Sequence, residues 1–180
     1  GSFYPFLYWK YHIEPEHLPH FNEFVGEIIN LRIINKKQGN KIYANGLKIA
    51  INRIFGGFAD KFGWLYDPKA LLQTTINGEL ILLMLAEELE SNGIKVFYYN
   101  TDGLTVECPV DKIELSNQIC KSFSEKIKIE LEVSEFKKCY IKDVNSFLNI
   151  KEDSIKYKGP YDYVSYIERY GEFDVRGSFN

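Results

Sequence analysis

Basic side chains recur at helical spacing between residues 32 and 52. Arg32 and Lys36 lie four positions apart, as do Lys48 and Asn52, so each pair would share one face of a helix. If the two helices form an antiparallel hairpin, these faces can present three cations and an amide to one ligand. Arg offers a bidentate fork and Lys a point charge, a combination that suits a polyphosphate. The same spacing also fits an ordinary solvated helix face.

A single acidic residue stands at the centre of a predicted β-hairpin. The sequence VFYYNTDGLTVECP, residues 96–109, contains two runs of β-forming residues separated by Asn100-Thr101-Asp102-Gly103. Asn and Gly tolerate the positive φ angles that tight turns need, which predicts strand, turn and strand. At the apex of such a turn, Asp102 either closes the turn or does chemistry, and the stretch alone favours the turn.

Two predicted helices position the basic residues. The first begins at Asn22, the predicted N-cap, and a second follows a Gly39-Asn40 turn and ends at Gly56-Gly57. Together they predict an antiparallel helical hairpin over residues 21–62. The predicted apolar face of the hairpin consists of Phe24, Ile28, Leu31 and Ile34 on the first helix and Ile42, Ile49 and Phe55 on the second.

Two further helices are predicted on either side of the β-hairpin. Asp67 and Pro68 are start signals for a helix over residues 69–92. The middle of this helix, residues 80–85, is apolar nearly all round, which predicts that it is buried. An amphipathic pattern predicts the second helix over residues 109–128.

The remaining segments have the composition of strands. Residues 1–13 are aromatic and β-like, and strand-like runs follow at residues 129–136, 138–150 and 154–161. Helices interleaved with antiparallel-type strands predict an α+β fold, with an antiparallel sheet, flanking helices and an inserted helical hairpin.

Composition excludes several classes of protein. The 180 residues, 45% of them hydrophobic, suffice for one compact domain with a core. A net charge of -3 excludes a grossly basic nucleic-acid binder, although a local basic groove remains possible. The three cysteines form no C-x-x-C pair, so neither a zinc site nor a disulfide framework is indicated, and the chain reads as intracellular. There is no signal peptide and no apolar run long enough to span a membrane.

Four motifs occur in order along the chain: Ser2-Phe3-Tyr4-Pro5, K-x-x-x-N-x-x-F-G from Lys48 to Gly56, YYNTDG at 98–103, and Lys138-Cys139-Tyr140. This series resembles the palm and fingers of a family B DNA polymerase of the compact phage or mobile-element type, over roughly residues 2–162. The corresponding family patterns are D-x-x-S-L-Y-P-S, K-x-x-x-N-S-x-Y-G, Y-x-D-T-D-S and K-x-Y. An upstream R-x-x-x-K pair of the family matches Arg32 and Lys36.

The resemblance implies a role for each matched residue. Asp102 would be catalytic and would bind Mg²⁺, of which the complete enzyme uses two ions, with Asn100 as a weaker ligand beside it. The implied contacts to the incoming dNTP are Arg32, Lys36, Lys48, Asn52, Ser2, Phe3 and Tyr4, and Tyr4 would also exclude a 2′-hydroxyl. The implied contacts to primer-template DNA are Lys138, Tyr140, Thr101 and Gly56.

The resemblance also implies a domain layout. The palm would comprise residues 1–20 and 63–165, the fingers residues 21–62, and residues 166–180 would be a tail leading to a thumb. An exonuclease domain and a thumb would belong to the remainder of the polymerase. The expected location is the cytoplasm of a bacterium or of an infected host.

Two departures from the family patterns bear on activity. Asn100 replaces the first carboxylate of the third motif, and the aspartate that opens the first motif would lie three positions before Ser2, outside this sequence. A lone carboxylate cannot offset the repulsion between two divalent ions. We therefore expect the 180 residues alone to fold but not to polymerise, with Mg²⁺ absent or bound as one ion.

Three other interpretations remain open. A catalytically dead relative would keep the fold and bind primer-template DNA or nucleotide without chemistry. A reverse transcriptase-like palm would favour two adjacent aspartates at the hairpin, and Asp102-Gly103 lacks the second. A purely structural α+β domain would make the ordered motifs coincidental.

Overall fold

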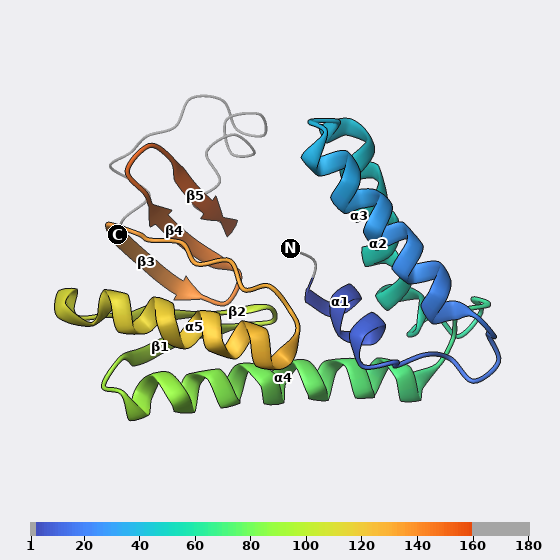
Figure 1. The fold of residues 1–180 in the computed structure, drawn as a ribbon, viewed down its shortest axis with the longest axis horizontal. Coiled ribbons are helices and arrows are strands. Elements are labelled where there is room, and N and C mark those ends of the chain that lie inside the picture. The colour runs from blue at the N-terminus through green and yellow to red at the C-terminus, as the bar shows by residue number, and fades with distance from the viewer. Residues whose placement is uncertain (1–2, 160–180) are drawn as a thin grey trace. The chain divides into compact units, whose positions relative to one another are not determined.

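The computed structural model describes residues 3–159 and consists of helices and two small antiparallel sheets (Figure 1). The elements are α1 (Phe3–Lys10), α2 (Phe21–Lys37), α3 (Lys41–Gly57), α4 (Pro68–Ser91), β1 (Lys95–Asn100), β2 (Gly103–Glu107), the short 3₁₀ helix η1 (Val110–Lys112), α5 (Ile113–Ile127), β3 (Lys138–Asp143), β4 (Ser146–Ile150) and β5 (Ile155–Lys158). The α+β prediction is confirmed. The chain divides into two compact units, the first ending at Glu132 and the second beginning at Val133.

The first element is a helix, so the strand predicted over residues 1–13 is wrong. Pro5 lies in the first turn of α1, where its missing N–H removes no helical hydrogen bond. Leu7 and Tyr8 are fully buried. The Tyr8 hydroxyl also donates to the carbonyl oxygen of Ile51 at 2.7 Å. Packing and this bond outweigh the β propensity of the aromatic residues.

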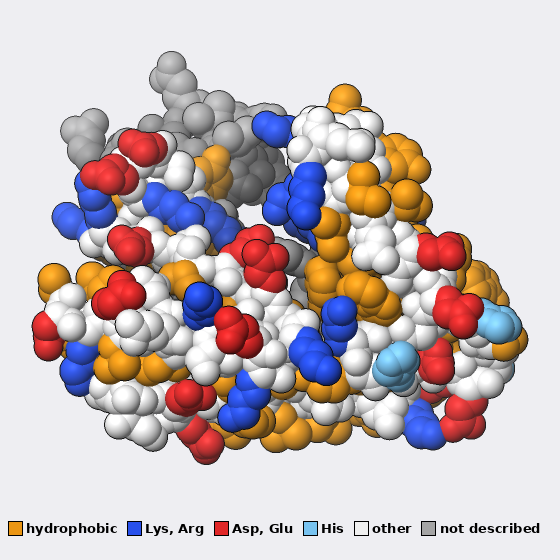
Figure 2. All heavy atoms as spheres, in the orientation of Figure 1, with side chains coloured by type: hydrophobic (Ala, Val, Ile, Leu, Met, Phe, Trp, Pro, Cys, Tyr) orange, Lys and Arg blue, Asp and Glu red, His pale blue; other side chains and the backbone are white. Residues whose placement is uncertain are grey.

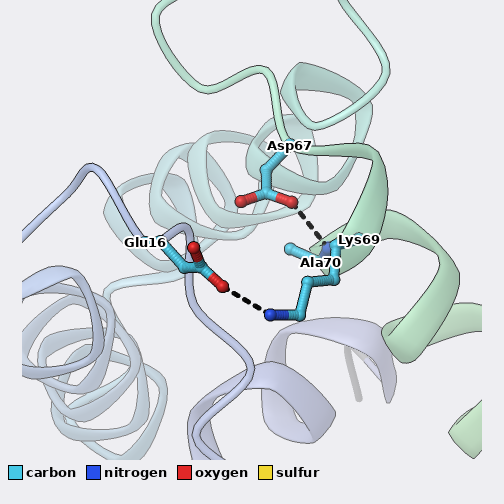
Figure 3. Close-up of polar contacts among 4 residues, drawn as sticks. All are labelled: Glu16, Asp67, Lys69 and Ala70. Atoms are coloured by element: carbon cyan, nitrogen blue, oxygen red, sulfur yellow. Dashed lines mark hydrogen bonds and ion pairs between the residues drawn. The ribbon is translucent and has the colours of Figure 1, made fainter.

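The long helix α4 starts where its signals predict. Asp67 caps it, because a carboxylate oxygen accepts from the backbone N–H of Ala70 at 2.9 Å, and Pro68 is its first residue (Figure 3). Lys69 adds an ion pair with Glu16, which ties the connector before α2 to the start of α4 (Figure 3). The predicted helix over residues 69–92 is therefore confirmed.

The prediction that the middle of α4 is buried all round is wrong. Ile81, Leu82 and Leu85 are buried, whereas Leu80 and Leu83 are about half exposed. α1, α5 and the β1–β2 hairpin contact α4, and in the part of the chain that is described nothing covers its other face. The exposed apolar line on that face comprises Leu72, Ile76, Leu80, Leu83 and Met84.

The helical hairpin is present as predicted, but it buries a different face. Phe24, Leu31 and Ile34 are about half exposed, because the core residues of α2 lie one position away from the predicted stripe. Gly26 explains part of the difference: a Cβ at this position would lie 2.5 Å from Nε1 of Trp9, so the glycine lets α1 approach α2. The buried residues of α2 are Phe21, Asn22, Val25, Gly26 and Ile29.

The predicted N-cap of α2 is also wrong. His20 is the N-cap residue, with a left-handed φ of 64°, and its side chain makes no capping bond. Asn22 lies inside the first turn and is buried, where its amide donates to the carbonyl oxygen of Tyr8 at 3.2 Å. The amide therefore satisfies a backbone group of α1 instead of its own helix end.

The first unit has two hydrophobic clusters. One joins α4, β1 and α5 and includes Leu85, Val96 and Phe123. The other joins α1 to the base of the α2–α3 hairpin and includes Tyr8 and Phe58. Among the described helices, none has the length and apolar character needed to cross a bilayer.

The second unit is a three-stranded antiparallel sheet in the order β3-β4-β5. The strands predicted at 138–150 and 154–161 are present within those limits as far as the chain is described. The strand predicted at 129–136 is not formed. Two backbone groups at the start of this segment bond to the hydroxyl of Ser124 instead of to a neighbouring strand. That hydroxyl donates to the carbonyl oxygen of Ile129 at 2.7 Å and accepts from the N–H of Leu131 at 3.4 Å.

Candidate active site

Asp102 lies at the exposed tip of the β1–β2 hairpin. Asn100 pairs with Gly103, so Thr101 and Asp102 alone form the turn. None of these four residues has a positive φ, and the predicted positive-φ turn is therefore wrong. Asn at the first and Gly at the fourth position are the preferences of a type I turn, which needs no positive φ.

The side chain of Asn100 shapes this turn. Its amide oxygen accepts from the backbone N–H of Thr101 at 2.7 Å and from the Thr101 hydroxyl at 3.2 Å. The atom that would coordinate a cation is thus engaged within the hairpin. The family pattern has an aspartate at both positions, whereas here Asp102 alone supplies a carboxylate.

Tyr4 marks the point where α1, α3 and α4 meet. Its ring centroid lies 4.4 Å from that of Phe55 on α3. On α4, a Cβ at Gly78 would lie 3.1 Å from the Tyr4 ring, so the glycine permits this close approach. Residues that are far apart in the sequence, from the first and second motifs, therefore contact one another.

Two carboxylates act on the hydroxyl of Tyr4. Partial burial raises the pKa of Tyr4, and the negative charges of Glu79 and Asp102 raise it further. The hydroxyl therefore stays protonated at neutral pH, and Asp102 lies within electrostatic reach of the first motif. The sequence prediction missed Glu79, because only the fold brings it close to Tyr4.

The three predicted cations lie on the faces that α2 and α3 turn toward their shared core. Arg32 and Lys36 continue the helical stripe of the buried Val25 and Ile29. Lys48 lies between the buried Ala44 and Ile51 on the corresponding stripe of α3. Figure 2 shows Lys and Arg side chains gathered along one edge of this hairpin and hydrophobic side chains along the opposite edge.

These cations differ in their surroundings. Arg32 and Lys48 are half-buried, whereas Lys36 is exposed and lies 4.0 Å from the carboxylate of Glu132. Asn52 is exposed one turn beyond Lys48. An exposed ion pair of this kind contributes little stability, so Lys36 remains available to an anion.

The donor set suits one divalent cation better than two. Among residues 3–159, no group of three or more His, Cys, Asp or Glu side chains could hold a metal ion. Asp102 is exposed and can offer oxygen ligands of the kind that Mg²⁺ prefers, but Asn100 is engaged in the turn. The fit is therefore to a single, weakly held ion.

The remaining predicted residues lie at several places. Phe3 packs beside Tyr4, with ring centroids 6.0 Å apart, and Gly56 is exposed near the end of α3. Lys138 and Tyr140 are exposed on β3 of the second unit. Ser2 and the tail at 166–180 lie outside the described residues.

Comparison with known proteins finds similarity to DNA polymerases. It is 31% identical to DNA polymerase II of Escherichia coli (strain K12) over 84 residues, which are 47% of this chain and 11% of that protein. The fold matches that of the family B DNA polymerase from the hyperthermophilic archaeon Pyrobaculum calidifontis, with a TM-score of 0.66 and 17% sequence identity over 98% of this chain and 29% of that chain. No protein-family model matches the chain.

The chain thus has the fold of part of a DNA polymerase. Its resemblance to the family B polymerases is confirmed by the sequence match and the fold together. It spans about a tenth of the E. coli protein and less than a third of the archaeal chain.

Proposed function

We propose that the chain is the nucleotide-holding part of a template-directed DNA polymerase, which transfers the nucleotidyl group of a dNTP to a primer 3′-hydroxyl and releases pyrophosphate. The observation that carries this proposal is the convergence at Tyr4. Phe55 of the second motif contacts its ring, and Asp102 of the third motif acts on its hydroxyl. Three motifs that are dispersed in the sequence would meet at one substrate.

The α2–α3 hairpin would hold the triphosphate. Arg32, Lys36 and Lys48 lie on core-directed stripes, so that a bound triphosphate could accept charge-assisted hydrogen bonds from both helices. Closure of the hairpin over the ligand would exclude water and strengthen these contacts. In this proposal residues 21–62 are the fingers, and residues 1–20 and 63–165 are the palm.

Tyr4 and Asp102 would act at the reacting end of the nucleotide. The protonated hydroxyl of Tyr4, with its ring held by Phe55 and Gly78, would pack under the sugar and exclude a 2′-hydroxyl. Asp102 would hold Mg²⁺, which when bound offsets the charge of the triphosphate and favours ionisation of the primer hydroxyl. Asn100 would fix the turn that presents Asp102.

A second candidate function is binding without chemistry. The observation that favours it is the lone carboxylate: Asn100 uses its oxygen within the turn, and among residues 3–159 no metal-binding cluster forms. Such a protein would bind nucleotide or primer-template DNA through the same cations and would lack turnover.

The test is titration calorimetry of the 180-residue chain with Mg²⁺ and a dNTP, beside primer extension by the same protein. We expect saturable nucleotide binding and no extension, because one carboxylate cannot hold two divalent ions close together. A folded chain that binds no dNTP would contradict the proposed function. Template-dependent extension by this chain alone would contradict the single-carboxylate argument, and extension by the longer polymerase distinguishes the enzyme from the binding module.

A further inference from the structure

The sheet of the second unit has one covered and one open face. Side chains alternate between faces along a strand, and residues paired across strands share a face. Phe147 and Asn149 are buried on one face, whereas Lys138 and Tyr140 are exposed on the other. By the strand register, the open face comprises Lys138, Tyr140, Leu148, Ile150, Ile155 and Tyr157.

Two tyrosines flank a leucine across this open face. Tyr140 pairs with Leu148, and Leu148 pairs with Tyr157, so the three side chains form one row across β3, β4 and β5. Tyr140 is 46% exposed, and Tyr157 is partly exposed. Because neighbouring strands lie about 4.8 Å apart, the backbones of the two tyrosines are separated by about 10 Å.

The described part of the second unit carries more positive than negative charge, and Lys138 brings one positive charge to the open face. Residues 133–159 contain six lysines and four carboxylates, although the whole chain has a net charge of -3. The paired positions that form this row and its neighbour, from Lys138 to Tyr140 on β3, carry no Asp or Glu, and Asp143 pairs with Ser146 only at the end of the sheet. Lys138 stands two residues from Tyr140 on the same strand. Aromatic hydroxyls beside a cation and without carboxylates suit a polyanion with hydrogen-bond acceptors, such as a nucleic acid.

We propose that Tyr157 is a DNA-contacting residue that acts together with Tyr140 on the duplex part of the primer-template. The inference rests on the proposed function. The resemblance to family B polymerases implies DNA contacts for Lys138 and Tyr140 and gives no role to Tyr157. Two tyrosines on strands about 10 Å apart can reach the two DNA backbones on either side of a minor groove about 6 Å wide. Each hydroxyl would donate to a backbone or groove acceptor of one strand, with Leu148 between them over the groove.

The test is fluorescence anisotropy with the 180-residue chain and a labelled duplex that carries a 5′ overhang, beside a single strand of the same length. Tyr157→Ala and Tyr140→Ala should each weaken duplex binding about fivefold, the worth of one net hydrogen bond, and Tyr157→Phe should do nearly the same because it removes only the hydroxyl. Lys156→Ala is the matched control, since Lys156 is exposed on the same strand and points to the opposite face. It should change duplex binding less than twofold.

The outcomes separate the inference from the proposed function. If Tyr140→Ala weakens binding and neither Tyr157 variant does, the inference is overturned and the proposed function stands. If the parent protein binds no duplex, both fail. Equal losses for single-stranded and duplex DNA would overturn the duplex assignment in favour of base stacking. Circular dichroism shows whether Tyr157→Ala folds. If Tyr157→Ala is unfolded, duplex binding by Tyr157→Phe is the test of the inference.

Discussion

The α2–α3 helical hairpin and the β1–β2 hairpin both hold residues assigned to one nucleotide, and they do so in different ways. The helical hairpin offers three cations on two regular helices, two of them half-buried. The β-hairpin offers one carboxylate at the exposed tip of a two-residue turn. In the proposed site three cations would therefore share the phosphates, whereas a single carboxylate in the turn would hold the metal.

The two hairpins also differ in how they are anchored. The base of the helical hairpin packs through the aromatic rings of Phe21 and Phe58 against Tyr8, with centroids 5.7 to 6.0 Å apart. The tip of the β-hairpin is held by hydrogen bonds of Asn100 to Thr101. We expect substitutions at the base of the helical hairpin to affect stability, and substitutions at the tip of the β-hairpin to affect activity.

The largest effect is expected at Asp102. In the polymerase of which the chain is proposed to be a part, Asp102→Ala should lower single-turnover nucleotide incorporation by about 1,000-fold or more, because the metal loses its main ligand. Thermal unfolding should be unchanged, since the side chain is exposed. Asn100→Asp is the control and should be tolerated. If Asp102→Ala incorporates nucleotide at near the parental rate, Asp102 is not the metal ligand.

A smaller effect is expected at Lys48. Lys48→Ala should raise the dNTP KM about 30-fold, since a charge-assisted contact of about 2 kcal/mol is lost while other cations remain. Arg53→Ala is the matched control, because Arg53 is exposed on the opposite face of α3. Steady-state kinetics at varied dNTP would show the difference. Equal effects of the two substitutions would indicate that Lys48 belongs to an ordinary solvated helix face and does not bind the dNTP.

Stability should respond to Tyr8. Tyr8→Phe should lower the free energy of unfolding by about 1 to 2 kcal/mol, because the buried hydrogen bond from the Tyr8 hydroxyl to the carbonyl oxygen of Ile51 is lost. Burial raises the pKa of Tyr8, so its stabilising contribution is complete below the pKa of an unfolded tyrosine, about 10, and is lost as the pH rises above it. Urea unfolding between pH 7 and 11 tests both points. If the parent protein and Tyr8→Phe lose the same free energy of unfolding between pH 7 and 11, ionisation of Tyr8 has no part in the loss and the prediction is contradicted.

The smallest effect is expected at Asn100. Asn100→Ala removes the side-chain oxygen that accepts two hydrogen bonds in the turn and should cost about 1 kcal/mol of stability or less, since the group is near the surface. Mg²⁺ affinity, measured by calorimetry, should change less than twofold. A large loss of Mg²⁺ affinity would show that Asn100 is a ligand instead of a turn former.

The sequence predicted helices more reliably than the faces they bury. Asp67 and Pro68 located the start of α4 because capping is a local property. The buried face of α2 depends on contacts between α1 and Gly26 that no local pattern contains. The strand predicted at the N-terminus failed for the same reason, because the environment of Tyr8 is tertiary. Glu79 escaped notice since only the fold brings it to Tyr4.

The most direct test of the account is a double-mutant cycle on Mg²⁺-dNTP binding with Lys48→Ala and Asp102→Ala in the 180-residue chain. If both residues serve one nucleotide, through its phosphates and its metal, the two losses should be coupled by about 0.5 kcal/mol or more in calorimetry. We expect Asp102→Ala to cost less binding energy once Lys48 is absent. Additive losses, or a nucleotide affinity that neither substitution changes, would contradict the single shared site.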